Sequence, residues 1–231
     1  MHRLRPWLVI LVFAAFISGS QGRAVAQTVS EQQILVDRAR STIEQFTAQS
    51  DMEQMRRILK KARAVVIFPQ ILKAGFIIGG EGGSGVLLAH DRQTGAWTAP
   101  SFYTLGSGSI GLQIGAEVAQ VVLLIMTDKA LNAVINNQVK LGADATIAVG
   151  PMGKGVEAAT TTALNADIYS FAATQGLFAG LSLAGSVIKA RNEWNRDYYG
   201  QPVTAGDIVI RRQVEAPAAA PLDQALTRAE L

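Results

Sequence analysis

A short stretch near residue 60 concentrates positive charge, with five cations in eight residues and no acidic residue among them. These cations are Arg56, Arg57, Lys60, Lys61 and Arg63. In a helix they cover two adjacent edges, and the remaining side carries Met52, Met55, Ile58 and Leu59. Such a helix could lie on an anionic membrane, with its cations on lipid phosphates and its apolar side chains packed inward or inserted into lipid. The same pattern also fits a solvated basic face at a helix C-terminus, where cations interact favourably with the helix dipole.

Three glycine-rich stretches resemble phosphate-binding loops. Two have the G-x-G-x-x-G spacing, at Gly80, Gly82 and Gly85 and at Gly106, Gly108 and Gly111. In a dinucleotide-binding fold the third glycine opens a helix, whereas both stretches here are followed by sequences typical of strands. We therefore interpret them as tight turns, bulges or closely packed strands. The third stretch, residues 150–155, could bind an anion through free amides and Lys154, but it is no Walker motif and a plain turn is the preferred interpretation.

Nucleophilic and metal chemistry have few candidate residues. The chain has 2 histidines and no cysteine, which excludes a thiolate metal site and a cysteine nucleophile. His90, followed by Asp91, could pair with a serine in a hydrolase. The serines considered are Ser84, Ser101, Ser107 and Ser109. None lies in a G-x-S-x-G motif, so we prefer a solvent-facing histidine at a strand end, expect no enzyme activity, metal or cofactor, and keep a hydrolase only as a further hypothesis.

The first 26 residues have the pattern of a secretory signal peptide. Arg3 and Arg5 precede an apolar run over 7–17, which is too short to span a membrane, and an A-x-A sequence ends at Ala26. We expect cleavage between Ala26 and Gln27 and a periplasmic or secreted protein, peripheral to the membrane. Removal of this segment leaves equal numbers of basic and acidic residues, so nucleic acid is not an expected partner and any electrostatic binding must be local.

The remaining pattern predicts an α+β domain over 27–212, in which N-terminal helices pack on a glycine-rich antiparallel sheet or partly closed barrel. Helices are expected at 31–48 and 51–61, the first with a capping box at Ser30 and Gln33 and the second with one at Ser50 and Glu53. Valine- and isoleucine-rich runs separated by glycine and proline predict strands at 64–68, 75–80, 85–90, 97–103, 108–114, 118–126, 146–149 and 166–174. Two later helices are expected, from about 127 to 135 and over 186–198. The alanine- and proline-rich tail, 213–231, is expected to be mobile with at most a short helix.

Several phrases in fixed order resemble the SYLF domain family, whose eukaryotic members include yeast actin-patch proteins. They are KARAVVIFP at 61–69, LKAGFIIGGEGGSGVLLAHD at 72–91, GAWTAPSFYTLGSGSIGLQIGAEVAQVVLLI at 95–125 and the later VGPMGKGVEA, IYSFAATQGLFAGLSLAGS and YYG. The resemblance covers about residues 60–210. It implies a module that binds acidic phospholipids through an amphipathic N-terminal segment and basic residues, and some fungal members also bind actin. By position it places headgroup contact at the cluster from Arg56 to Arg63 and at Lys73.

These observations lead to the hypothesis of an exported lipid-binding protein that associates with anionic phospholipid membranes through a basic amphipathic helix. The signal peptide and the absence of additional cytoskeletal modules argue against actin or phosphoinositides as partners in a bacterial envelope. Without a cysteine at the cleavage site the chain cannot take a lipoprotein form. The alternative is a non-catalytic structural or protein-interaction component of the cell envelope, in which the same helix packs wholly against the sheet.

Overall fold

The computed structural model describes residues 29–75, 78–91, 93–110, 115–136, 138–150, 166–174, 177–179 and 183–231. The predicted signal peptide and most of the 150–155 stretch lie outside these ranges. A curved, largely antiparallel sheet forms the centre, in the order β6-β10-β4-β2-β1-β5-β8-β7, with β3 on β2 and β9 on β8. Its strands are β1 (Ala64–Gly75), β2 (Ile78–Asp91), β3 (Ala96–Trp97), β4 (Ser101–Ile110), β5 (Gly115–Ile125), β6 (Val139–Lys140), β7 (Ile147–Val149), β8 (Ile168–Thr174), β9 (Leu177–Ala179) and β10 (Val187–Ala190). Among the strands of the described ranges only β7 and β8 pair in parallel, and an isolated parallel bridge joins Leu141 and Ala145.

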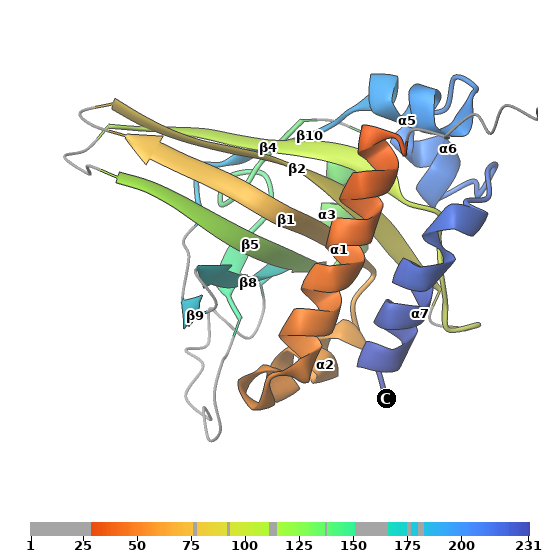
Figure 1. Cartoon of the computed structure of the whole chain (residues 1–231), viewed down its shortest axis with the longest axis horizontal. Helices are drawn as coiled ribbons and strands as arrows, with labels where there is room; N and C mark the ends of the chain where they lie inside the picture. The colour runs from red at the N-terminus through yellow and green to blue at the C-terminus, as the bar shows by residue number, and fades with distance from the viewer. Residues whose placement is uncertain are drawn as a thin grey trace, which may run out of the picture.

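Helices cover both faces of the sheet, and the predicted α+β class is confirmed. They are α1 (Glu31–Ala48), α2 (Glu53–Leu59), α3 (Asp128–Asn136), α5 (Asn192–Tyr199), α6 (Ala205–Val209) and α7 (Ala220–Ala229). Helices α1, α2 and α7 share one apolar core with the sheet, while α3 and α6 pack into a second core on the opposite face. Figure 1 shows α1 crossing β1, β2 and β5, whose far halves extend beyond the helix. No helix in the described ranges is both long enough and apolar enough to cross a membrane.

Strand β1 shows why the sheet needs helices on both sides. Val65 and Ile67 point into the α1 core and Val66 and Phe68 into the α3 core, and all four are fully buried. Continuous apolar sequence is therefore required here, since alternate side chains of a strand point to opposite faces. The register of β1 shifts against both neighbours around Pro69, which cannot donate a ladder hydrogen bond.

Several predicted strand ends are wrong because glycine does not end the strands here. Strand β1 runs on to Gly75, and β2 and β4 pass through the glycines at 80, 82, 106 and 108. The helix expected over 186–198 is instead strand β10 followed by α5. Ser186 precedes the strand, in which Val187–Ala190 pairs with β4 residues Gly106–Tyr103. Cross-strand pairing of Val187 and Ile188 thus overrides the helical reading.

The expectation of a mobile tail is also wrong. Residues 220–229 form α7, in which Leu222, Ala225, Leu226 and Ala229 are buried. Their spacing makes one helical stripe, and α7 packs alongside α1 (Figure 1).

Candidate lipid-binding site

The apolar side of the predicted membrane helix faces the protein. Met52, Met55 and Leu59 are fully buried in the core shared with α1, and Ile58 packs against the same core. The membrane-facing role predicted for Met52, Met55 and Leu59 is therefore wrong, because these side chains anchor α2 to the core, while Ile58 is half-buried. The second helix also begins later than the expected Asp51. A 3-10 turn over Ser50–Met52 precedes α2, which begins at Glu53 without a side-chain cap.

The basic cluster is divided by its internal contacts. Arg56 Nη1 donates to the Thr47 carbonyl at 2.6 Å and fastens α2 to the end of α1. Arg57 pairs with Glu53 at 2.8 Å, and Arg63 pairs with Asp128 at 3.0 Å. The expected row of five cations directed together at a membrane is thus not formed. Lys60 and Lys61 are exposed just after α2, and their contact with headgroups stays a prediction.

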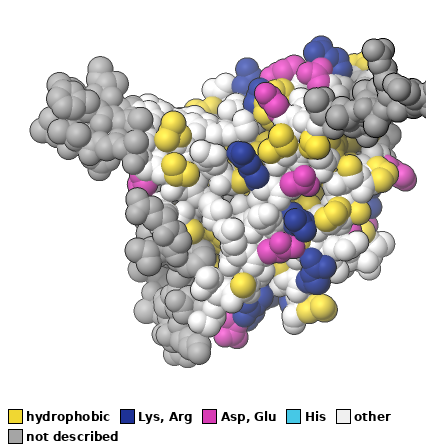
Figure 2. Space-filling model, in the orientation of Figure 1, with side chains coloured by type: hydrophobic (Ala, Val, Ile, Leu, Met, Phe, Trp, Pro, Cys, Tyr) yellow, Lys and Arg dark blue, Asp and Glu magenta, His cyan; other side chains and the backbone are white. Residues whose placement is uncertain are grey.

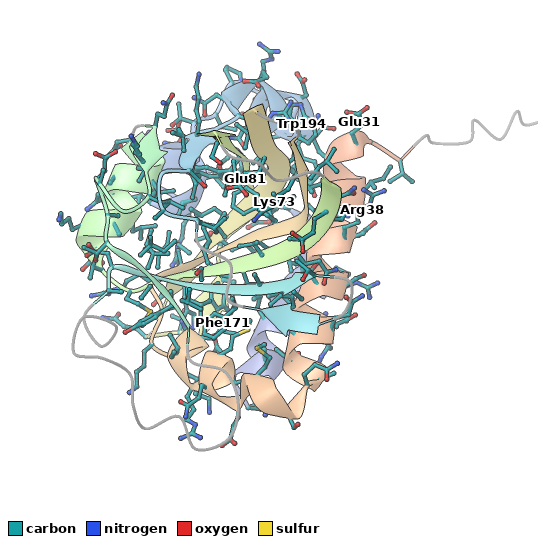
Figure 3. All side chains as sticks on the ribbon, turned by 90° about the vertical axis from the view of Figure 1, so that its left-hand side faces the viewer. Glu31, Arg38, Lys73, Glu81, Phe171 and Trp194 are labelled. Carbon is teal, nitrogen blue, oxygen red and sulfur yellow. The ribbon has the colours of Figure 1, made fainter. Side chains whose placement is uncertain are left out.

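Lys73 lies far from this cluster, at the other end of β1. Nine residues separate it from Ala64, which is about 30 Å along a strand. Its ammonium group pairs with the Glu81 carboxylate of β2 at 3.3 Å, on the face of the sheet opposite to α1. Glu81 also accepts hydrogen bonds from Ser107 and Ser186, at 2.9 and 2.8 Å. Figure 3 shows Lys73 and Glu81 together on the sheet. The structure therefore does not combine Lys73 with α2 into one headgroup site.

The arrangement needed for a serine hydrolase is not formed by the described residues. Ser107 is directly opposite Glu81 on β2. Glu81 lies nine residues before His90 on the same strand, a separation of about 30 Å, so Ser107 is far from His90. Ser84 accepts from Arg191, and Ser101 bonds with Asn195. Across the described ranges no group of three or more histidine, aspartate or glutamate side chains could hold a metal ion.

His90 instead contacts Trp97 and Glu230, which follows α7. Its ring stacks on Trp97 with 4.5 Å between centroids, and its Nε2 lies 3.4 Å from Oε1 of Glu230, just after α7. Burial raises the pKa of Glu230 to about 7, and the carboxylate of Asp223 acts in the same direction, although Trp97 and Lys60 favour the charged form. The carboxyl group thus binds a proton more tightly in the folded chain than its ordinary pKa of 4.5 would allow.

This raised pKa gives a pH dependence of stability. The stabilisation is fully present below about pH 4.5 and is lost as the pH rises toward 7, because the folded protein must then hold a charged carboxylate in a buried place. We expect Glu230→Gln to raise the melting temperature at pH 8 by a few degrees relative to the wild type, and the difference to vanish near pH 5. Thermal melts across this range measure it. Glu215→Gln, at an exposed glutamate of the same tail, is the control, and a constant difference between Glu230→Gln and wild type at all pH values would contradict the assignment.

A groove of about 450 Å³ lies on the α1 face of the sheet, between α1, β1, β2 and α5. Its apolar part is made by Ile34 and Leu35 of α1, Leu72 of β1 and Trp194 of α5, and Gly82 of β2 contributes bare backbone to the floor. Ile34 is 41% exposed and Leu72 50% exposed, so the groove presents apolar surface to solvent. Figure 3 shows Glu31 and Arg38 on α1 and Trp194 across from them.

Arg38 lines the polar part of this groove, and Arg191 contacts two of its lining residues, Ser84 and Trp194. Arg38 Nη1 lies 3.5 Å from Oε1 of Gln70 on β1, and Arg191 Nη1 donates to Oγ of Ser84 on β2 at 3.0 Å. The Arg191 guanidinium also lies over the Trp194 ring, 3.5 Å from its centroid, a cation–π contact that fixes both side chains. An open cavity that combines apolar walls with positioned arginines suits an anionic amphiphile.

The two helices that border the groove are braced against each other. The Tyr198 hydroxyl of α5 donates to Oε1 of Gln33 on α1 at 2.9 Å. The Ser30 hydroxyl caps α1 by accepting from the backbone N–H of Gln33 at 3.1 Å, which is one half of the predicted capping box. The other half is absent, because the side-chain amide nitrogen of Gln33 donates to Asp37 and to the Ala218 carbonyl.

Sequence reasoning missed this groove because its parts come from three distant segments. Arg38 is one of two arginines on α1, and Arg191 and Trp194 lie in the segment for which the sequence predicts one helix. In the conspicuous cation-rich stretch after residue 55, Arg56 instead binds the end of α1 and Arg63 pairs with Asp128 of α3.

The fold is thus an α+β half-barrel with an open groove beside α1, and comparisons with known proteins identify its family. The sequence model of the Ysc84 family, described as "Las17-binding protein actin regulator", matches residues 106–229. The chain therefore belongs to the Ysc84 family, which confirms the predicted SYLF relationship.

Relatives from animals and yeast extend the match toward the N-terminus. The chain is 35% identical over 154 residues to rat SH3 domain-containing YSC84-like protein 1, covering 66% of this chain and 45% of the relative. It is 35% identical over 172 residues to LAS seventeen-binding protein 3 of Saccharomyces cerevisiae, covering 73% and 37%, and 33% identical over 168 residues to yeast Protein YSC84, covering 71% and 36%. The chain thus spans less than half the length of these relatives.

Proposed function

We propose that this protein is a non-enzymatic binding protein that associates peripherally with anionic phospholipid membranes. The observation that carries the proposal is the groove between α1 and α5, which exposed apolar side chains and Arg38 line and where Arg191 contacts the lining residues Ser84 and Trp194. A phospholipid offers both an apolar chain and a phosphate, which are the groups that such a groove complements. Helix α2 is not the inserted element, because its apolar side is buried.

We further propose that the protein acts outside the cytoplasm, in a bacterial envelope. The proposal rests on the signal-peptide pattern of residues 1–26. Cell fractionation and N-terminal sequencing of the mature protein test it. A chain beginning at Gln27 in the periplasmic or secreted fraction would support export, whereas an intact N-terminus in the cytosol would contradict it.

Vesicle co-sedimentation tests the lipid function. We expect the purified protein to pellet with vesicles of phosphatidylcholine plus phosphatidylglycerol and to remain in solution with phosphatidylcholine alone. Binding should weaken at high salt, because the attraction to surface phosphates is partly screened. Equal pelleting with both vesicles, or with neither, would reject anionic phospholipid as the ligand. The double change Lys60→Glu and Lys61→Glu shows in the same assay whether the exposed end of α2 adds to the binding.

A second candidate function is protein interaction. It is favoured by the names of the relatives, one of which is a LAS seventeen-binding protein. Salt-insensitive capture of a defined envelope protein, together with no vesicle binding, would select this function over the first.

A further inference from the structure

We propose that Arg38 and Arg191 form a two-point clamp for the phosphate of one phospholipid molecule, whose acyl chain lies over Leu72 and the glycine-rich part of β2 and β4. This inference rests on the proposed lipid-binding function and assigns it a site and a ligand group. It differs from general attraction to a charged surface because it requires a headgroup that enters the groove.

The register of the sheet brings the two arginines together. Gln70, which Arg38 contacts, and Ser84, which accepts from Arg191, are direct partners across β1 and β2. Side chains of directly opposed residues start about 5 Å apart. Two guanidinium groups from distant parts of the chain are therefore held on adjacent lining residues of the groove. Each guanidinium has five N–H donors, and the contacts described leave most of them for a ligand.

The surrounding charges favour a compact anion in direct contact. Glu31 lines the groove, and Glu193 lies 3.5 Å from Nε of Arg191. These carboxylates offset the long-range field of the arginines, so attraction depends on short, directed hydrogen bonds. Arginine forks match the geometry of phosphate oxygens, which makes phosphate the complementary group. Removal of the nearby negative charge by Glu31→Gln should strengthen binding.

The path for an acyl chain continues from the groove across the sheet. Leu72 is opposite Gly82 on β2, and Gly82 is opposite Gly106 on β4, so the three form one row on the α1 face. Val118 of β5, 45% exposed, is opposite Leu72 on its other side. A methyl group at Gly82 or Gly106 would come no closer than 3.6 or 3.9 Å to any neighbouring atom, so internal packing does not require these glycines. Because these glycines have no side chains, the surface of the sheet beside Leu72 is open for an acyl chain. Figure 2 shows this part of the surface as mainly uncharged, whereas positive and negative side chains alternate along α1.

The test compares Arg38→Gln and Arg191→Lys with a matched control. The lysine keeps the positive charge but loses the fork, and thermal melts verify that each variant is folded. The control is Arg228→Gln, which removes an exposed arginine paired with Glu44 near the other end of α1. The probes are phosphatidylglycerol vesicles, soluble short-chain phosphatidic acid and glycerol phosphate, the last of which has the phosphate without an acyl chain.

We expect each groove variant to bind short-chain phosphatidic acid about tenfold more weakly than wild type, and the Arg228→Gln protein to bind as the wild type does. Glycerol phosphate should bind far more weakly than the short-chain lipid. Wild-type affinity in folded Arg38→Gln and Arg191→Lys proteins that still bind vesicles would overturn the clamp and leave the lipid function standing. Equal affinity for glycerol phosphate and the short-chain lipid would overturn the acyl path. Failure of the wild type to bind anionic vesicles would reject the proposed function itself.

Discussion

Gly83→Ala is expected to destabilise the protein by about 3 kcal/mol, whereas Gly82→Ala at the next position should leave it as stable as before or slightly more stable. A methyl group on Gly83 would clash with the Gln70 carbonyl oxygen and lie 3.2 Å from Cα of Ile71, both of them backbone atoms of β1. They cannot move aside without breaking the ladder where β1 shifts register. A methyl group on Gly82 points to the other face and has its nearest neighbour at 3.6 Å.

Thermal or denaturant unfolding of both variants measures this difference. For a chain of this size the loss at Gly83 corresponds to a fall of roughly 10 °C in melting temperature. Neither glycine has a positive φ, so the contrast isolates the close approach of β1 from backbone conformation. Equal stability of the two variants would show that β1 and β2 are not packed in this register.

The two glycines also show what the sequence could and could not indicate. The sequence identifies a glycine-rich, strand-forming region, and β2 and β4 run through its glycines. It cannot separate Gly83, required by a bulge in the neighbouring strand, from Gly82, which internal packing tolerates as a larger residue. That distinction depends on the register between β1 and β2, which is a property of the pairing and not of either segment alone.

The first two helices illustrate the same limit for the site. Periodicity correctly predicts α1 from Glu31 to Ala48 and an apolar side on α2. An amphipathic pattern, however, has the same spacing whether its apolar side faces lipid or a protein core. The burial of Met55 and Leu59 shows that the apolar side of α2 faces the protein core. The sequence around Arg38 and Arg191 does not indicate that they lie close together, because their proximity depends on the pairing of Gln70 with Ser84.

Leu226→Ala should destabilise the fold by about 3 kcal/mol, which is the effect of opening a cavity in a core and not of altering a tail. Leu226 is fully buried in the core that α7 shares with α1 and α2. Its neighbours on the stripe, Ala225 and Ala229, are small, which lets α7 lie close to α1, where Ala39 is also fully buried. Alanine in this segment therefore serves close helix packing, although the composition suggested a mobile extension.

Chemical denaturation measures the loss, and Gln224→Ala on the exposed side of the same helix is the control, with an expected change within about 0.5 kcal/mol.

A chain ending at Arg212 provides a second, independent measurement. It should unfold at a clearly lower temperature than the full chain, because the apolar surface under α7 becomes exposed to water. If Leu226→Ala and Gln224→Ala proved equally stable and the shortened chain melted like the full one, α7 would contribute nothing to the core. If the losses appear as expected, residues 220–229 are part of the folded domain, and the contact of His90 with Glu230 holds the end of that helix and not a loose terminus.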